Sequence, residues 1–185
     1  MLLFIGDSVT DCGRLQPVGR GPAPALGHGY VAQVDAGLRS PRAGRLAEVV
    51  NMGTSGNTVR DLSARWDRDV VALRPSWLCV LIGTNDVWRQ FDGRNPPAAV
   101  MPDEFGRTYD ALLSRTRLLV EKLVLMTPFY VQDDRGDPMR RRMDEYGAMA
   151  RWGSTSSWPS TRRSSGRGLR PSRATGCTRP ARATG

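Results

Sequence analysis

Few of the features that mark secreted, metal-binding or membrane-spanning proteins occur in this sequence of 185 residues. Its three cysteines, Cys12, Cys79 and Cys177, include no pair at the C-x-x-C spacing of zinc and redox sites. No apolar run approaches the roughly 20 residues of a membrane-spanning helix. The first residues, MLLFIGDS, contain neither a basic stretch nor a small-residue cleavage site. These absences predict a cytoplasmic protein without a disulfide framework, a metal site or a membrane span.

Acidic residues are absent from the end of the chain, and this explains most of the net charge of +9. Residues 151–185 hold eight arginines and no acidic residue, whereas residues 1–150 hold 19 basic and 18 acidic residues. An arginine- and serine-rich arm can bind nucleic acid without sequence specificity. Because the rest of the chain is nearly neutral, we expect no specific nucleic-acid partner.

Aliphatic residues are also almost absent from residues 151–185, which consist mainly of Ser, Thr, Arg, Gly, Pro and Ala. The segment has no helical or strand period and cannot bury an apolar face, which is typical of disorder. Read in another frame with GC-rich codons, the stretch around Cys177 encodes approximately Gly-Asp-Arg-Val-His-Pro-Thr. We therefore predict a domain over residues 1–150 and a disordered tail over residues 151–185 that is translated out of frame.

Short apolar runs alternate with helical patterns in residues 1–150, and this alternation predicts a parallel sheet built from βαβ units. We expect strands at residues 2–5, 48–51, 77–82 and 123–126. We expect helices at residues 30–38, 58–69, 102–117 and 138–150. A further strand and a closing helix would complete such a fold, but the tail stands in their place, so we expect them to be missing.

Three polar, glycine-bearing loops follow the first three expected strands: GDS at residues 6–8, NMGTSGNT at 51–58 and GTND at 83–86. Because sites in open α/β sheets form beyond the carboxyl ends of the strands, these loops should converge. Together they offer a serine hydroxyl, flexible backbone amides and a carboxamide. These are the parts of a nucleophile with an oxyanion hole.

The three motifs, in this order and each after a strand, resemble the first three blocks of the GDSL/SGNH esterase–lipase family over residues 2–150. The resemblance implies a flavodoxin-like three-layer α/β/α sandwich that hydrolyses a small-molecule carboxylic ester without a cofactor. It also implies that Ser8 is the nucleophile, and that the amides of Ser8 and Gly56 with the Asn85 side chain form the oxyanion hole. The G-x-S-x-G motif of the α/β-hydrolases is absent, which argues against that other class.

Neighbouring residues are expected to support the site, and we single out Asp7, Gly83, Thr84 and Asp86, with Gly53 and Ser55 shaping the turn. Asp7 is interpreted as a turn residue whose carboxylate bonds local backbone amides, not as a catalytic acid. Asp86 is interpreted as organising its own loop, not as a metal ligand. At Gly56 a side chain would restrict the close approach of the backbone.

Other chemistry-bearing residues have two interpretations each. Trp88 and Phe91 follow the third loop and either line an acyl or sugar pocket or belong to the core. Cys12 has no activating neighbour in the sequence and is treated as inert. An acidic loop after the last expected strand is interpreted as solvated and not as a cation site; it contains Asp133, Asp134 and Asp137.

The base that would take the proton from Ser8 is missing. The family's fourth block is an Asp-x-x-His motif near the carboxyl terminus, and this sequence contains none, so it has no candidate for either residue. The only histidine is His28, which we interpret as a loop residue and not as a substitute base. The main alternative to an impaired esterase is therefore a non-catalytic α/β domain that binds a ligand.

Overall fold

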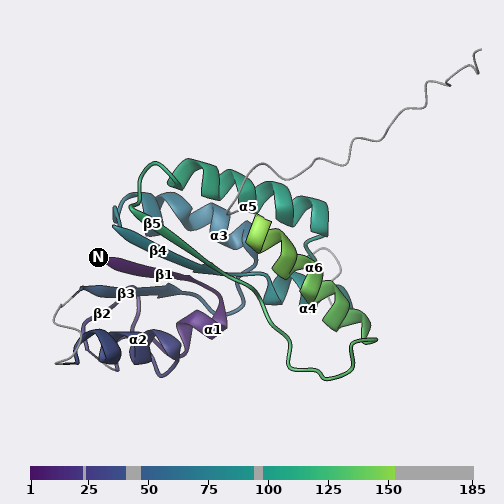
Figure 1. The fold of residues 1–185 in the computed structure, drawn as a ribbon, viewed down its shortest axis with the longest axis horizontal. Coiled ribbons are helices and arrows are strands. Elements are labelled where there is room, and N and C mark those ends of the chain that lie inside the picture. Colours follow the sequence, from purple (N-terminus) through teal and green to yellow (C-terminus); the bar gives the residue numbers. More distant parts are fainter. Residues whose placement is uncertain (23, 41–46, 94–97, 153–185) are drawn as a thin grey trace, which may run out of the picture.

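The computed structural model describes residues 1–22, 24–40, 47–93 and 98–152. A five-stranded sheet lies between helices on both faces (Figure 1). Its strands are β1 (Leu2–Gly6), β2 (Gly19–Arg20), β3 (Val49–Gly53), β4 (Trp77–Leu81) and β5 (Lys122–Met126). Their order is β2-β3-β1-β4-β5, and all neighbours are parallel except β2 and β3. The described chain is therefore the three-layer α/β fold that the sequence predicts.

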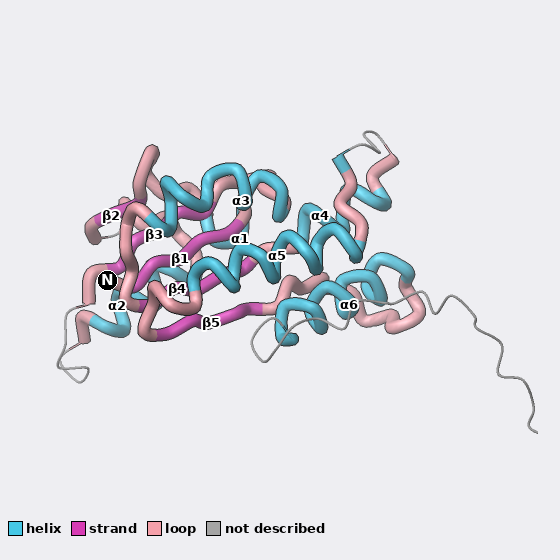
Figure 2. Tube along the Cα trace, turned by 90° about the horizontal axis from the view of Figure 1, so that it is seen from above, coloured by secondary structure: helices cyan, strands magenta, loops and turns pink. Residues whose placement is uncertain are grey.

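The two helical layers differ in size. One face carries the short α1 (Ser8–Asp11) and α2 (Tyr30–Leu38), and the other carries α3 (Val59–Trp66) and α5 (Pro102–Thr116) (Figure 1). The α3 helix continues as a π-helix, η1 (Asp67–Val71). The helices α4 (Thr84–Phe91) and α6 (Pro138–Trp152) pack against each other, and α6 also packs against α5 (Figure 2).

The central strands are buried on both faces, which explains their unbroken apolar sequences. Alternate residues of β1 and β4, such as Leu3 and Leu78, enter the larger core with α3, α5 and α6. The intervening residues, such as Phe4 and Cys79, enter a smaller core with Val31 of α2. The sheet is thus held by two cores, and the α3–α5 side holds most of the buried apolar residues.

Three elements of the structure were not predicted, and one edge of the otherwise parallel sheet is antiparallel. The two-residue β2 runs antiparallel to β3, and it is too short to produce a hydrophobic period. The four-residue α1 and the α4 helix begin within the polar loops, where the sequence pattern predicted only turns. At the other end of the chain, α6 extends to Trp152, two residues past the expected end of the domain. The rest of the predicted tail, including Cys177, lies outside the described residues.

The strand β5 lies at the outer edge of the described sheet. The helix α2 covers one face of the sheet but does not reach this edge. On that face, Trp77 of β4 and Val124 of β5 remain 44% and 39% exposed. The opposite face of β5 is better covered, since Leu123 and Leu125 pack against the larger core. Within the described segments, no helix is both long and apolar enough to cross a membrane.

Two tryptophans test which packing holds the fold. Trp66 is fully buried, and its Nε1 donates a hydrogen bond of 2.9 Å to Thr116 Oγ1. We expect Trp66→Ala to lower the free energy of unfolding by about 3–5 kcal/mol, because it leaves a large cavity. Trp77→Ala, at the exposed edge, should cost about 1 kcal/mol or less. Urea denaturation of both variants measures the difference; equal losses would contradict this account of the core.

Candidate active site

The three polar loops leave adjacent strands at the same level of the sheet. In the parallel register, Gly6 at the end of β1 lies beside Gly53 of β3 on one side and beside Leu81 of β4 on the other. The loops that follow therefore begin side by side at the carboxyl edge. This is the convergence that the sequence pattern predicts.

Ser8 is the first residue of α1 and is exposed. The helix begins there because Asp7 caps it: Asp7 Oδ1 accepts a 3.0 Å hydrogen bond from the Val9 amide. The turn also needs a glycine at position 6, because a Cβ atom there would lie 2.1 Å from the Leu81 carbonyl oxygen. The Gly-Asp-Ser sequence thus brings the chain tightly across the β4 end and presents the serine hydroxyl at the surface.

Gly56 lies in the loop between β3 and α3 and adopts a φ of +81°, which side chains rarely tolerate. The nearest protein atom to a methyl group added at this position would be Arg89 Nη2, at an ordinary 3.8 Å. The backbone conformation therefore requires the glycine, whereas neighbouring protein atoms do not. Arg89 of α4 also holds the peptide group that follows Gly56, since its Nη2 donates a 2.6 Å hydrogen bond to the Gly56 carbonyl.

The loop that holds Gly56 is tied to both of its neighbours. From the α1 side, Asp11 Oδ2 accepts hydrogen bonds from the Ser55 amide at 3.1 Å and the Ser55 hydroxyl at 2.7 Å. From the α4 side, Asn85 Nδ2 donates to the Asn57 carbonyl at 2.9 Å. Asp86 Oδ1 accepts from the Val59 amide at 2.9 Å, which joins the start of α3 to α4. These contacts bring Ser8, Gly56 and Asn85 to one edge of the sheet.

Two backbone amides at this edge are left available for a ligand. Among the described residues, neither the Ser8 amide nor the Gly56 amide donates a hydrogen bond to another protein group. Asn85 uses only one of the two hydrogens on Nδ2 for the Asn57 carbonyl. Three donors can therefore serve an oxygen atom bound near Ser8.

Burial sets the ionisation of two carboxyl groups in these loops. Asp7 and Asp86 are fully buried, and one oxygen of each, Oδ2, has no hydrogen-bond partner in the described structure. Burial raises the pKa of Asp7 to about 6. Burial, with a smaller contribution from the charge of Asp7, raises the pKa of Asp86 to about 7. The loops are therefore held by carboxyl groups that the protein environment disfavours in their charged form.

Gly83 and Thr84 complete the third loop. Gly83 has a φ of +127°, and a Cβ atom there would lie 3.0 Å from Pro128 Cγ, so both conformation and space require glycine. Thr84 is the first residue of α4, directly before Asn85. The Gly-Thr-Asn-Asp sequence thus turns the chain from β4 into the helix that carries the carboxamide.

The remaining candidates from the sequence lie outside the Gly-Asp-Ser, Gly56 and Gly-Thr-Asn-Asp segments. His28 is exposed, and its amide donates to the carbonyl of Cys12, the residue that follows α1. Trp88 and Phe91 are 42% and 46% exposed, so neither belongs to the core. In the acidic loop, Asp133 and Asp134 are exposed. In the described part of the chain, no group of three or more His, Cys, Asp or Glu residues could hold a metal ion.

Four residues that organise this edge were missed in the sequence: Asp11, Asn51, Arg65 and Arg89. Asn51, for example, is fully buried; its Oδ1 accepts from the Gly53 amide, and its Nδ2 donates to the carbonyls of Thr10 and Leu26. One signal was available for Arg65, because it follows Leu62 by three residues and so lies on the apolar face of α3. The contacts of Asp11 and Arg89 join distant segments and leave no local pattern.

The buried carboxyl of Asp86 should make stability depend on pH. Its pKa is higher in the folded protein than in the unfolded chain, so the folded state loses stability as pH rises from about 4 to about 7. We expect Asp86→Asn to remove this pH dependence. At about 1.4 kcal/mol per pKa unit, the dependence changes the free energy of unfolding by at most about 4 kcal/mol. Its free energy of unfolding relative to the unsubstituted protein should therefore increase with pH. Asp133→Asn, at an exposed position, is the control; identical pH profiles for both variants would contradict the prediction.

Comparisons with known proteins agree with the fold. An acetylxylan esterase from Geobacillus stearothermophilus is 50% identical over 151 residues, which are 81% of this chain and 69% of that protein. The crystal structure of an acetylxylan esterase from the same organism superposes with a TM-score of 0.80 at 49% identity, covering 83% of this chain and 70% of the other. An alpha/beta hydrolase enzyme from the metagenome of Lake Arreo, Spain, gives a TM-score of 0.78 at 46% identity, covering 83% and 71%.

The matched structures also include catalytic mutants of the Geobacillus esterase, in which alanine replaces a serine, an aspartate or a histidine. The likeness to an esterase identifies this chain as a serine ester hydrolase with a small-molecule ester substrate, and it does not favour a non-catalytic binding domain. The sequence profile of the GDSL-like lipase/acylhydrolase family matches residues 4–153. On this match and on the half-identical relative, the chain belongs to the GDSL-like lipase/acylhydrolase family.

Proposed function

We propose that this chain carries the nucleophile and the oxyanion hole of an esterase that removes acetyl groups from a carbohydrate. The observation that carries the proposal is the arrangement of Ser8, the Gly56 loop and Asn85 at the ends of three adjacent strands. Asp7, Gly83, Thr84 and Asp86 shape and hold these loops. No metal or cofactor takes part in this chemistry.

In the proposed reaction, the Ser8 hydroxyl oxygen attacks the ester carbonyl carbon while its proton passes to a base. The bond to the sugar oxygen then breaks, the sugar leaves with a proton, and an acyl-serine remains. Water attacks the acyl-serine in the second step and releases acetate and the free hydroxyl. Ser8 is suited to this role because it is exposed at the start of α1.

The negative charge of each tetrahedral intermediate lies on the former carbonyl oxygen. The amides of Ser8 and Gly56 and the Asn85 side chain are proposed to donate to that oxygen. The Arg89 contact to the Gly56 carbonyl helps to hold this loop, because it fixes the peptide group that follows Gly56. Losing one such donor typically costs about 3 kcal/mol of transition-state stabilisation.

The carbohydrate part of the proposal rests on two observations. The half-identical relative is an acetylxylan esterase. In this chain, Trp88 follows Asn85 by three residues on α4 and is 42% exposed. Residues three apart on a helix lie on the same face. A partly exposed indole ring on the face of Asn85 offers a flat apolar surface to a sugar ring, and we propose Trp88 as a substrate contact.

The base that activates Ser8 is proposed to be absent from the chain as written. In the Geobacillus esterase, the aspartate and histidine of the catalytic mutants stand three positions apart. The present sequence has no Asp-x-x-His motif, and its one histidine is His28. We propose that residues 151–185 are an out-of-frame reading of the segment that supplies this pair, and that residues 1–150 form the esterase domain.

Ser8 can be tested directly with a fluorophosphonate probe. We expect the probe to label Ser8, slowly in this chain and quickly once the alternative frame supplies a histidine. Ser8→Ala should abolish labelling without changing the circular dichroism spectrum, because the serine is exposed. Ser63→Ala, on the exposed face of α3, is the control and should label normally. Labelling of Ser8→Ala equal to that of the unsubstituted protein would remove Ser8 from the mechanism.

Three proteins test the missing base: this chain, its His28→Ala variant and a version whose last 35 codons are read in the alternative frame. Removing the histidine of a serine hydrolase costs about 10⁶-fold in turnover. We therefore expect the first two proteins to hydrolyse p-nitrophenyl acetate equally poorly, and the third to be active. High activity of this chain that disappears in His28→Ala would show that His28 is the base.

A further inference from the structure

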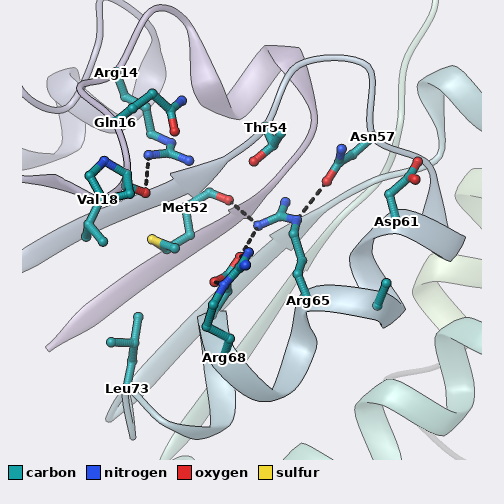
Figure 3. Close-up of a pocket in the computed structure, with 13 residues that line it drawn as sticks. Arg14, Gln16, Val18, Met52, Thr54, Asn57, Asp61, Arg65, Arg68 and Leu73 are labelled. Atoms are coloured by element: carbon teal, nitrogen blue, oxygen red, sulfur yellow. Dashed lines mark hydrogen bonds and ion pairs between the residues drawn. The ribbon is translucent and has the colours of Figure 1, made fainter.

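One buried cation lies behind the nucleophile turn and the Gly56 loop. Arg65 projects from α3, and only 9% of its side chain is exposed. It lines a cavity of about 620 Å³ between α3 and the β2–β3 edge of the sheet (Figure 3). The polar wall of this cavity includes Thr54 and Asn57, which belong to the loop that carries Gly56.

The Arg65 guanidinium donates to the ends of two strands at once. Its Nη2 donates to the Gly6 carbonyl at the end of β1 at 2.9 Å. Its Nη1 donates to the Met52 carbonyl near the end of β3 at 2.8 Å. Ser8 follows Gly6 by two residues, and Gly56 follows Met52 by four. A single rigid group therefore joins the segments that lead to both residues.

The same guanidinium also reaches the loop itself. Its Nε donates to Asn57 Oδ1 at 2.7 Å, and the Asn57 carbonyl in turn accepts from Asn85. Its charge is balanced by Asp69, whose Oδ2 lies 2.8 Å from Nη1. Burial alone would raise the pKa of Asp69. The guanidinium groups of Arg68 and Arg65 nevertheless hold this pKa below its usual range. The cation is thus buried with a charged partner and with hydrogen bonds from all three nitrogens.

We propose that Arg65 is a positioning residue that sets the spacing between the Ser8 turn and the Gly56 loop. The inference rests on the proposed function of Ser8 and Gly56. Arg65 does not contact the reacting atoms; it acts through the carbonyls and the Asn57 side chain that it holds. A planar guanidinium with five N–H groups can bond several acceptors in fixed directions, whereas a lysine ammonium is a single point on a flexible stem. The role therefore requires arginine, not only a positive charge.

The chain offers a matched control one turn further along the helix. Arg68 also pairs with Asp69, through Nε to Oδ1 at 2.6 Å, but its side chain is 75% exposed and none of its contacts reaches a strand end. Arg65→Met and Arg68→Met each remove a guanidinium that binds Asp69. Only the first removes the bonds to Gly6, Met52 and Asn57.

The full chain is compared with both variants by hydrogen exchange, read by mass spectrometry, and by the rate of fluorophosphonate labelling of Ser8. In Arg65→Met we expect faster exchange in residues 4–11 and 51–59, with unchanged exchange in β4. Labelling of Ser8 should slow by about 10²-fold, the effect of a misplacement of about 1 Å. Arg68→Met should match the unsubstituted chain in both measurements. If Arg65→Met instead loosens all segments equally, the role is merely structural and the proposal is overturned.

Two further variants keep the test decisive if Arg65→Met does not fold. Arg65→Lys retains the charge and should still slow labelling. Arg65→Ala opens a space beside the cavity, and ethylguanidinium at millimolar concentration should restore labelling there but not in Ser8→Ala. Full labelling by Arg65→Lys, or no rescue of Arg65→Ala, overturns the proposal. If exchange loosens locally but Ser8 is never labelled in any protein, Arg65 still positions the loops, and the proposed nucleophile fails instead.

Discussion

The Gly6 carbonyl joins the turn that carries Ser8 to the loop that carries Gly56. It accepts a hydrogen bond from the Thr54 amide at 3.0 Å and another from Arg65 Nη2 at 2.9 Å. The first bond continues the pairing of β1 with β3 beyond the sheet, and the second connects that edge to α3. Because β1 leads to Ser8 and β3 leads to Gly56, the geometry of the proposed reaction depends on this oxygen and its two donors.

Buried polar side chains replace regular secondary structure at this edge. Parallel strands end there together, and their last backbone groups must find partners outside the sheet. Asn51, Asp11, Asp86 and Arg65 supply those partners from four different segments. The arrangement has an electrostatic cost, since burial raises the pKa of Asp7 to about 6 and that of Asp86 to about 7. A rigid set of loops is therefore maintained at some expense of stability near neutral pH.

Most of the fold followed from local patterns. The continuous apolar run in β4 identified a buried strand. The alternation of apolar and polar residues in α3, which places Leu62 and Trp66 on one face, identified a helix, because the buried positions of an element repeat with its own period. The exceptions were β2, α1 and α4. The β2 and α1 elements are short, and α4 begins inside a polar loop. Contacts such as the pairing of β2 with β3 join distant segments and leave no periodic trace in the sequence.

By itself the sequence determined the family and showed that a polar loop follows each of three strands. It also identified Ser8, Gly56 and Asn85 as candidates, because each belongs to a motif that is contiguous in the chain. It also revealed that no Asp-x-x-His pair is present. The tertiary structure alone decided that Gly56 is required by its φ of +81° and not by neighbouring protein atoms. It alone placed Arg65 against the ends of β1 and β3, because Gly6 lies 59 positions away in the chain and only folding brings the two together.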